Sequence, residues 1–144
     1  MSQTRLRFLF RKNHILLWLP PVIYFGIISF LSSLSHPPQV FPDFAYIDKF
    51  EHFSVYFVFG FLLARSGIWE LVWHPVWSFK IKLILVCIII SAGAIDEWHQ
   101  SFVPNRMVDF FDWVADTCGA TCGYLLGRWI YNIRIKKILK ERQL

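Results

Sequence analysis

Four apolar stretches dominate the chain and limit what it can fold into. A helix needs about 20 mostly apolar residues to cross the hydrocarbon core of a bilayer. The expected spans are residues 15–34, 47–68, 79–100 and 109–131, of which the second and fourth carry charged residues well inside the stretch. We therefore predict an all-α fold, an integral membrane bundle of four transmembrane helices located as a multi-pass protein in the cell membrane.

Length and composition favour a single membrane domain. The chain has 144 residues, of which 56% are hydrophobic and 19% are aromatic. This is too apolar for a small soluble protein, and the length suits one domain, so we assign residues 1–144 to one transmembrane domain. The net charge is +5, but the basic residues cluster at the chain ends and beside apolar stretches. That pattern favours a membrane surface as the partner, and we expect no nucleic acid.

Lysine and arginine residues determine the predicted orientation. Loops on the cytoplasmic side of a membrane carry an excess of these residues. With the N-terminus inside, 13 of the 15 Lys and Arg residues fall on the cytoplasmic side, and Lys49 and Arg106 are the two outside. Both termini are therefore predicted to be cytoplasmic, with residues 35–46 and 101–108 outside.

Acidic residues gather at the opposite, outer ends of the spans. Eight of the ten lie there, namely Asp43, Asp48, Glu51, Asp96, Glu97, Asp109, Asp112 and Asp116. Helical spacing places them on shared faces, because residues three or four positions apart lie on one side of a helix. Asp48 shares such a face with His52 and Tyr56 on the second helix, and Asp96 shares one with Gln100 on the third.

The fourth stretch carries one continuous stripe of acidic and small residues. Steps of three or four positions connect Asp109, Asp112, Asp116, Gly119, Gly123 and Gly127. Glycines at this spacing form a surface on which another helix packs closely, so we predict that the stripe contacts a helix of the same chain. Its acids should then face the bundle interior, where a carboxylate must be paired or protonated. For Asp116, a purely structural role as the partner of an arginine or hydroxyl is the alternative.

These faces predict one shared polar site near the outer membrane interface. Each would be unfavourable against lipid, so we expect the three faces to meet. Arg106, on the short loop before the fourth span, could fold back over the acids and offset their repulsion or hold an anionic group. The predicted site, catalytic if the protein is an enzyme, comprises Asp48, His52, Asp96, Glu97, Gln100, Arg106 and Asp112.

Two motifs resemble the VanZ-like family of small membrane proteins. They are DKFEHFSVYFVFG, from Asp48 to Gly60, and DEWHQSFVPNRMVDFFDWVADTCGATCG, from Asp96 to Gly123. The sequence departs from the family pattern at Asn105, where members often have Gly, and at Asp116, where many have Asn. The resemblance implies an association with low-level resistance to teicoplanin, a lipoglycopeptide that acts at the outer face of the membrane. It brings no agreed reaction.

Three kinds of function remain open at this stage. In an enzyme, paired carboxylates could divide acid and base roles, His52 or His99 could relay protons, and Arg106 with Lys49 could hold a phosphate or carboxylate. A divalent cation such as Mg²⁺ or Ca²⁺ could bind hard oxygen ligands from Asp48, Glu51, Asp96, Asp109 and Asp112. A binding protein would recognise a lipid, an antibiotic or a partner protein. We expect a protein that acts on or binds a cell-envelope or lipid-linked ligand, and the alternative is a non-catalytic membrane protein that binds a divalent cation, a lipid or a partner protein.

Overall fold

The structure, a computed structural model, describes residues 14–36, 46–73 and 78–141. These residues form four α-helices and no strand: α2 (His14–Ser32), α3 (Ile47–Trp73), α4 (Ser78–Gln100) and α5 (Phe110–Glu141). The prediction of an all-α chain with four helices is confirmed. The main difference is length, because α3 and α5 continue several residues past the ends of their predicted spans.

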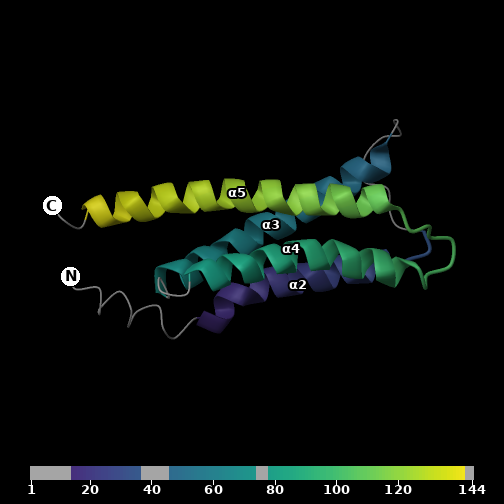
Figure 1. Cartoon of the computed structure of the whole chain (residues 1–144), viewed down its shortest axis with the longest axis horizontal. Helices are drawn as coiled ribbons and strands as arrows, with labels where there is room; N and C mark the ends of the chain where they lie inside the picture. The colour runs from purple at the N-terminus through teal and green to yellow at the C-terminus, as the bar shows by residue number, and fades with distance from the viewer. Residues whose placement is uncertain (1–13, 37–45, 74–77, 142–144) are drawn as a thin grey trace.

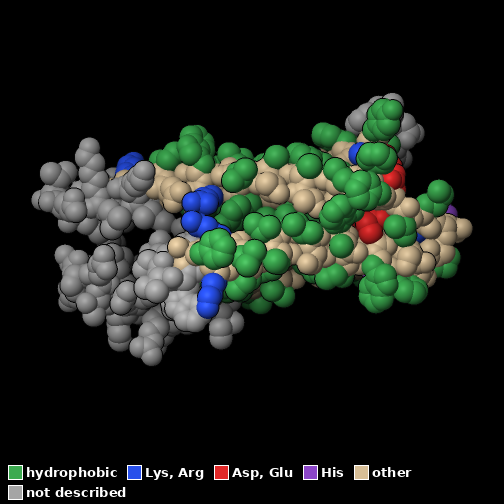
Figure 2. Space-filling model, in the orientation of Figure 1, with side chains coloured by type: hydrophobic (Ala, Val, Ile, Leu, Met, Phe, Trp, Pro, Cys, Tyr) green, Lys and Arg blue, Asp and Glu red, His purple; other side chains and the backbone are tan. Residues whose placement is uncertain are grey.

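The four helices run side by side along the long axis of the molecule and alternate in direction (Figure 1). The start of α2 and the last turns of α5 lie at one end of the bundle, and residues 101–109 lie at the other (Figure 1). Figure 2 shows Lys and Arg side chains near the first of these ends and acidic side chains near the second. We call them the basic end, which includes Arg65, Lys80 and Arg128, and the acidic end, which includes Asp96, Asp112 and Asp116.

Several predicted features lie outside the described residues. They are the basic residues at positions 5, 7, 11 and 12, and residues 37–45 of the predicted outer loop, including Asp43. Among the described residues, α4 is the one helix both long and apolar enough to cross a membrane, and α2 contains a shorter apolar segment, Leu16–Ser32. Only 22% of the apolar window of α4 is buried inside the bundle. A helix with such an exposed apolar surface indicates association with a membrane.

The closest packing in the bundle joins α5 to α3. A Cβ atom at Gly119 would collide with the backbone carbonyl of Phe53, and one at Gly123 would collide with that of Phe57. Only glycine lets the two backbones approach this closely. The prediction that the glycine stripe contacts another helix of the chain is therefore confirmed, and α3 is that helix.

The apolar core fills the rest of the bundle between α2, α3 and α4. Its most buried members on these helices include Ile28, Phe59, Leu63 and Leu85. The Ser66 hydroxyl lies within this core but donates a 2.7 Å hydrogen bond to the Leu17 carbonyl, so its burial leaves no unpaired donor. This core holds together three of the helices whose ends carry the polar side chains of the acidic end.

Candidate functional site

The acidic end of the bundle contains four buried carboxylates. They are Asp96 and Glu97 at the end of α4, and Asp112 and Asp116 in the first turns of α5. Both α3 and α5 begin here, and the partial positive charge at a helix N-terminus favours nearby carboxylates. The arrangement follows from the alternating direction of the helices, which brings the polar end of each one to the same place.

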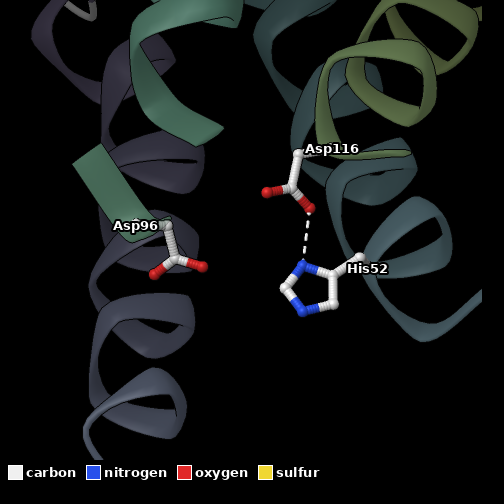
Figure 3. Close-up of side chains that lie close together, drawn as sticks. All are labelled: His52, Asp96 and Asp116. Atoms are coloured by element: carbon white, nitrogen blue, oxygen red, sulfur yellow. Dashed lines mark hydrogen bonds and ion pairs between the residues drawn. The ribbon is translucent and has the colours of Figure 1, made fainter. Parts of the chain in front are cut away.

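Asp116 lies at the centre of this group and is fully buried. Its Oδ1 atom is 2.9 Å from Nδ1 of His52 on α3 (Figure 3). On the opposite side lies α4, where a Cβ atom at Gly93 would come within 2.9 Å of the Asp116 Cβ atom. Glycine at this position therefore leaves the space that the Asp116 side chain occupies.

Asp96 approaches the same centre from α4. Figure 3 shows its carboxylate directed toward the His52 ring, across the space from Asp116. Its Oδ2 atom accepts a 3.2 Å hydrogen bond from Nε2 of Gln100, one helical turn further on. Within the described residues, Asp96 Oδ1 and Asp116 Oδ2 are buried and accept no hydrogen bond.

Lys49 neutralises the outer part of the group. Its Nζ atom lies 2.7 Å from Asp48, 2.5 Å from Asp109 and 2.8 Å from Asp112. The side chain of Asp48 is 58% exposed, whereas that of Asp112 is 10% exposed, so the lysine joins the solvent-facing rim to the buried interior. The deeper carboxylates of Asp96 and Asp116 receive no such contact from Lys49.

Glu97 ties the end of α4 to the start of α5. Its Oε2 atom accepts a 3.1 Å hydrogen bond from the backbone N–H of Asp109. Asp109 in turn caps α5, because its Oδ1 atom accepts a 2.8 Å hydrogen bond from the N–H of Phe111. These two bonds hold the short loop and the helix start in place around the buried acids.

Arg106 points toward α2 and does not fold over the acids. Its Nε atom donates a 3.3 Å hydrogen bond to the carbonyl of Leu34, just beyond the end of that helix. Among the described residues, Lys49 rather than Arg106 forms the ion pairs with the carboxylates. The preceding residue, Asn105, has a φ of 63°, a left-handed conformation that asparagine tolerates better than most residues other than glycine.

A cavity of about 340 Å³ opens beside the buried acids, between α2, α3 and α4. One part of its wall is apolar and includes Ile28, Leu31 and Val55. The other part is polar and is formed by Glu51, His52, Asp96, Gln100 and Arg106. A ligand in this cavity would therefore meet apolar side chains and charged groups at the same time.

The structure sorts the predicted site residues into two groups. It brings together five of them: His52, Asp96, Glu97, Gln100 and Asp112. The other two make different contacts, since Asp48 is on the exposed rim and Arg106 donates its hydrogen bond to the Leu34 carbonyl. His99 also turns away, and its Nε2 atom lies 2.9 Å from the hydroxyl of Ser33, the residue after the end of α2.

Two residues outside the predicted set have central positions. Asp116, which the sequence predicts to face inward, pairs with His52, and Lys49 contacts three carboxylates. Helical spacing carries a signal for both: Asp116 follows Asp112 by four positions, and Lys49 precedes His52 by three. A purely structural role for Asp116 was expected to pair it with an arginine or a hydroxyl group, whereas its observed partner is His52.

The geometry also permits a metal ion. Donor atoms of His52, Asp96 and Asp116 lie within 4.8 Å of one another, and so do those of His52, Glu97 and Asp112. The oxygen ligands predicted for Mg²⁺ or Ca²⁺ share only Asp96 and Asp112 with these groups. In both groups the imidazole of His52 takes part, which the sequence-based ligand set does not include.

Comparison with known protein families gives a match over most of the chain. The sequence model of the family described as VanZ/LLP1 matches residues 4–131, which is most of the chain and includes every residue of the acidic end. No curated protein and no solved structure matches the chain.

Proposed function

The chain belongs to the VanZ/LLP1 family, and we propose that it is a multi-pass protein of the cell membrane. In this proposal it holds a cell-envelope or lipid-linked ligand at an outward-facing acidic site. Residues 1–144 form one transmembrane domain in this proposal. The exposed apolar surface of α4 supports the membrane location. The lysine and arginine distribution supports cytoplasmic termini, because the basic end would lie inside and the acidic end outside.

The observation that carries the proposal is the mixed character of the cavity. Its apolar wall at Ile28, Leu31 and Val55 suits a hydrocarbon chain, and its polar wall suits a headgroup. Arg106 lines that polar wall and offers an anionic group a charge-assisted hydrogen bond. An amphipathic molecule entering from the outer membrane interface would match both walls. The family's association with teicoplanin resistance makes this lipoglycopeptide one candidate ligand and anionic phospholipid another.

A binding experiment on the full-length protein in detergent tests this proposal. The probes are phosphatidylglycerol and teicoplanin, and saturable binding to the unmodified protein is expected for at least one of them. Leu31→Trp, which fills the cavity, and Arg106→Ala, which removes the cation, should each weaken that binding at least about tenfold, or about 1.4 kcal/mol. Mass analysis of the probe after incubation separates binding from conversion.

The matched control is Ile27→Trp. Ile27 lies on the same helix as Leu31 but is 48% exposed and does not line the cavity, so this change should leave affinity unaltered. Undiminished binding by both Leu31→Trp and Arg106→Ala would overturn the cavity as the ligand site.

The proposed orientation has a separate test. A fluorescent protein fused to the C-terminus should be fluorescent, and alkaline phosphatase fused there should be inactive, because the first matures in the cytoplasm and the second outside it. An active C-terminal phosphatase, together with a dark fluorescent fusion, would reverse the orientation.

A further inference from the structure

We infer that His52, Asp96 and Asp116 form a binding site for a divalent transition metal ion. The three side chains come from α3, α4 and α5, and their donor atoms lie within 4.8 Å of one another (Figure 3). Metal–ligand bonds are about 2.0–2.2 Å long, so two donors on one ion lie at most about 4.4 Å apart, and small side-chain rotations would bring all three donors to a single ion. The inference concerns these side chains alone and does not rest on the ligand proposed for the cavity.

Two buried carboxylate oxygens at this position have no hydrogen bond among the described residues. Asp96 is 3% exposed and Asp116 is 0% exposed, and each has one carboxylate oxygen without a hydrogen bond among the described residues. Figure 3 shows both carboxylates directed into the space beside the His52 ring. A buried carboxylate oxygen without a partner is strongly unfavourable, and a bound cation would satisfy both oxygens at once.

The local charge balance also favours a cation. Lys49 is occupied by Asp48, Asp109 and Asp112 at the outer part of the group. Among the described residues, His52 is then the one basic side chain in contact with the deeper acids, and it pairs with Asp116. Asp96 forms no ion pair with a lysine or arginine of the described residues.

Neighbouring residues orient the proposed ligands. Gln100 donates its hydrogen bond to Oδ2 of Asp96, which leaves Oδ1 without a hydrogen bond among the described residues. Residues that hold a metal ligand through its second atom commonly change metal affinity by about 10- to 100-fold when they are removed. Gly93 acts sterically, since a Cβ atom there would lie 3.2 Å from Oδ2 of Asp116.

The donor types indicate the class of metal. Mg²⁺ and Ca²⁺ prefer ligand sets composed of oxygen atoms, whereas an imidazole nitrogen with carboxylates suits Zn²⁺ and related transition metals. His52 and Asp96 line the cavity, whereas Asp116 is fully buried and does not. One side of the ion would thus face the cavity, where a water molecule or ligand group can complete its coordination.

The second group of close donors is a weaker candidate. It shares His52, but its Asp112 is already paired with Lys49, and one oxygen of its Glu97 accepts the Asp109 N–H. Each of these carboxylates thus has one partner that a metal ion would have to share, and only the second oxygen of Glu97 is buried without a hydrogen bond or an ion pair among the described residues. In the first group neither carboxylate is paired with Lys49, and Asp96 Oδ1 and Asp116 Oδ2 both accept no hydrogen bond among the described residues.

Metal titration of the full-length protein in detergent tests the inference. After treatment with a chelator, the protein should bind one equivalent of Zn²⁺ by calorimetry, and Co²⁺ should give visible absorption bands characteristic of nitrogen and oxygen ligands. Asp96→Asn and Asp116→Asn, which keep the side-chain shape, should each lower Zn²⁺ affinity more than about 100-fold. Gln100→Ala should lower it about 10- to 100-fold.

Asp48→Asn is the matched control, because this carboxylate lies on the exposed rim and outside the proposed site. It should leave Zn²⁺ affinity unchanged. Far-UV circular dichroism checks that each variant is folded, and either of the two ligand variants suffices if the other does not fold. Absence of saturable Zn²⁺ binding, equal affinity in a folded ligand variant, or displacement of Zn²⁺ by an equal concentration of Mg²⁺ would overturn the assignment.

Discussion

The contact between α3 and α5 differs completely between its two halves. From Gly119 toward the basic end, glycines place the two backbones in direct contact. Toward the acidic end, the same faces of the same helices meet through His52 and Asp116, and buried carboxylate oxygens have no hydrogen-bond partner among the described residues. One half is packed as tightly as two helices allow, and the other contains charged groups whose interactions are incomplete.

This difference distinguishes the residues that stabilise the bundle from the residues that are suited to binding a ligand. Close backbone contact stabilises the bundle through dispersion energy and does not require a ligand. Buried carboxylates lower stability unless they are compensated, and proteins retain such groups at binding and catalytic sites. We therefore expect substitutions in the glycine half to affect folding, and substitutions in the acidic half to affect folding less and ligand binding more.

The largest effect should come from filling the glycine half. Gly123→Leu would drive a side chain into the Phe57 carbonyl and force α5 away from α3. Overpacking of a well-packed core usually costs about 1–3 kcal/mol, and here the obstacle is backbone, so we expect about 3 kcal/mol or more. Thermal unfolding in detergent measures the loss.

Gly26→Leu is the control for that experiment. Gly26 lies on α2, and a Cβ atom there meets nothing within 4 Å. The change should leave stability unaltered or raise it slightly, because leucine is a better helix former than glycine. Equal melting temperatures for the two variants would show that the glycine half does not hold the bundle together.

A smaller loss should follow removal of the lysine that compensates the acidic half. Lys49→Met keeps the length of the side chain but leaves the buried Asp112 without its cation. Exposed ion pairs contribute about 1 kcal/mol or less, and breaking a fully buried pair costs about 3–5 kcal/mol. The Lys49 side chain is 25% exposed, so we expect an intermediate loss of about 2 kcal/mol in the unfolding free energy.

Asp48→Asn is the variant to compare with Lys49→Met. Asp48 contacts the same lysine but its side chain is 58% exposed, so its removal should change stability much less than Lys49→Met does. If the two variants unfolded alike, the ion pairs of the rim would matter as much as those of the interior.

Local spacing was sufficient to predict much of this architecture. The lengths of the apolar stretches predicted the four helices. Steps of three and four positions predicted that the stripe containing Gly123 contacts another helix and that Asp112 and Asp116 face inward. These properties depend on one helix at a time, because the period of 3.6 residues fixes which side chains share a face.

Pairings across helices could not be predicted in the same way. Spacing along one helix does not say how far each helix slides against the next, and that offset decides which of Lys49 and Arg106 reaches the acids. The direction of Arg106 depends on the loop, where the left-handed Asn105 turns the chain so that the arginine meets the Leu34 carbonyl. Asp48 looked equivalent to His52 by spacing, but it lies one turn nearer the helix start and is exposed.

The smallest effect should appear at Tyr56, one turn of α3 beyond His52, where the two halves of the contact meet. Its side chain is 1% exposed, and its hydroxyl donates a 3.3 Å hydrogen bond to the Ala92 carbonyl of α4. Tyr56→Phe keeps the ring and removes this bond, so unfolding in detergent should show a loss of about 1 kcal/mol. Tyr46→Phe, at a position that is 78% exposed, should show none. A loss of about 3 kcal/mol or more at Tyr56 would instead mean that the hydroxyl supports the buried carboxylates, and that the division between a packed half and a polar half lies deeper in the bundle.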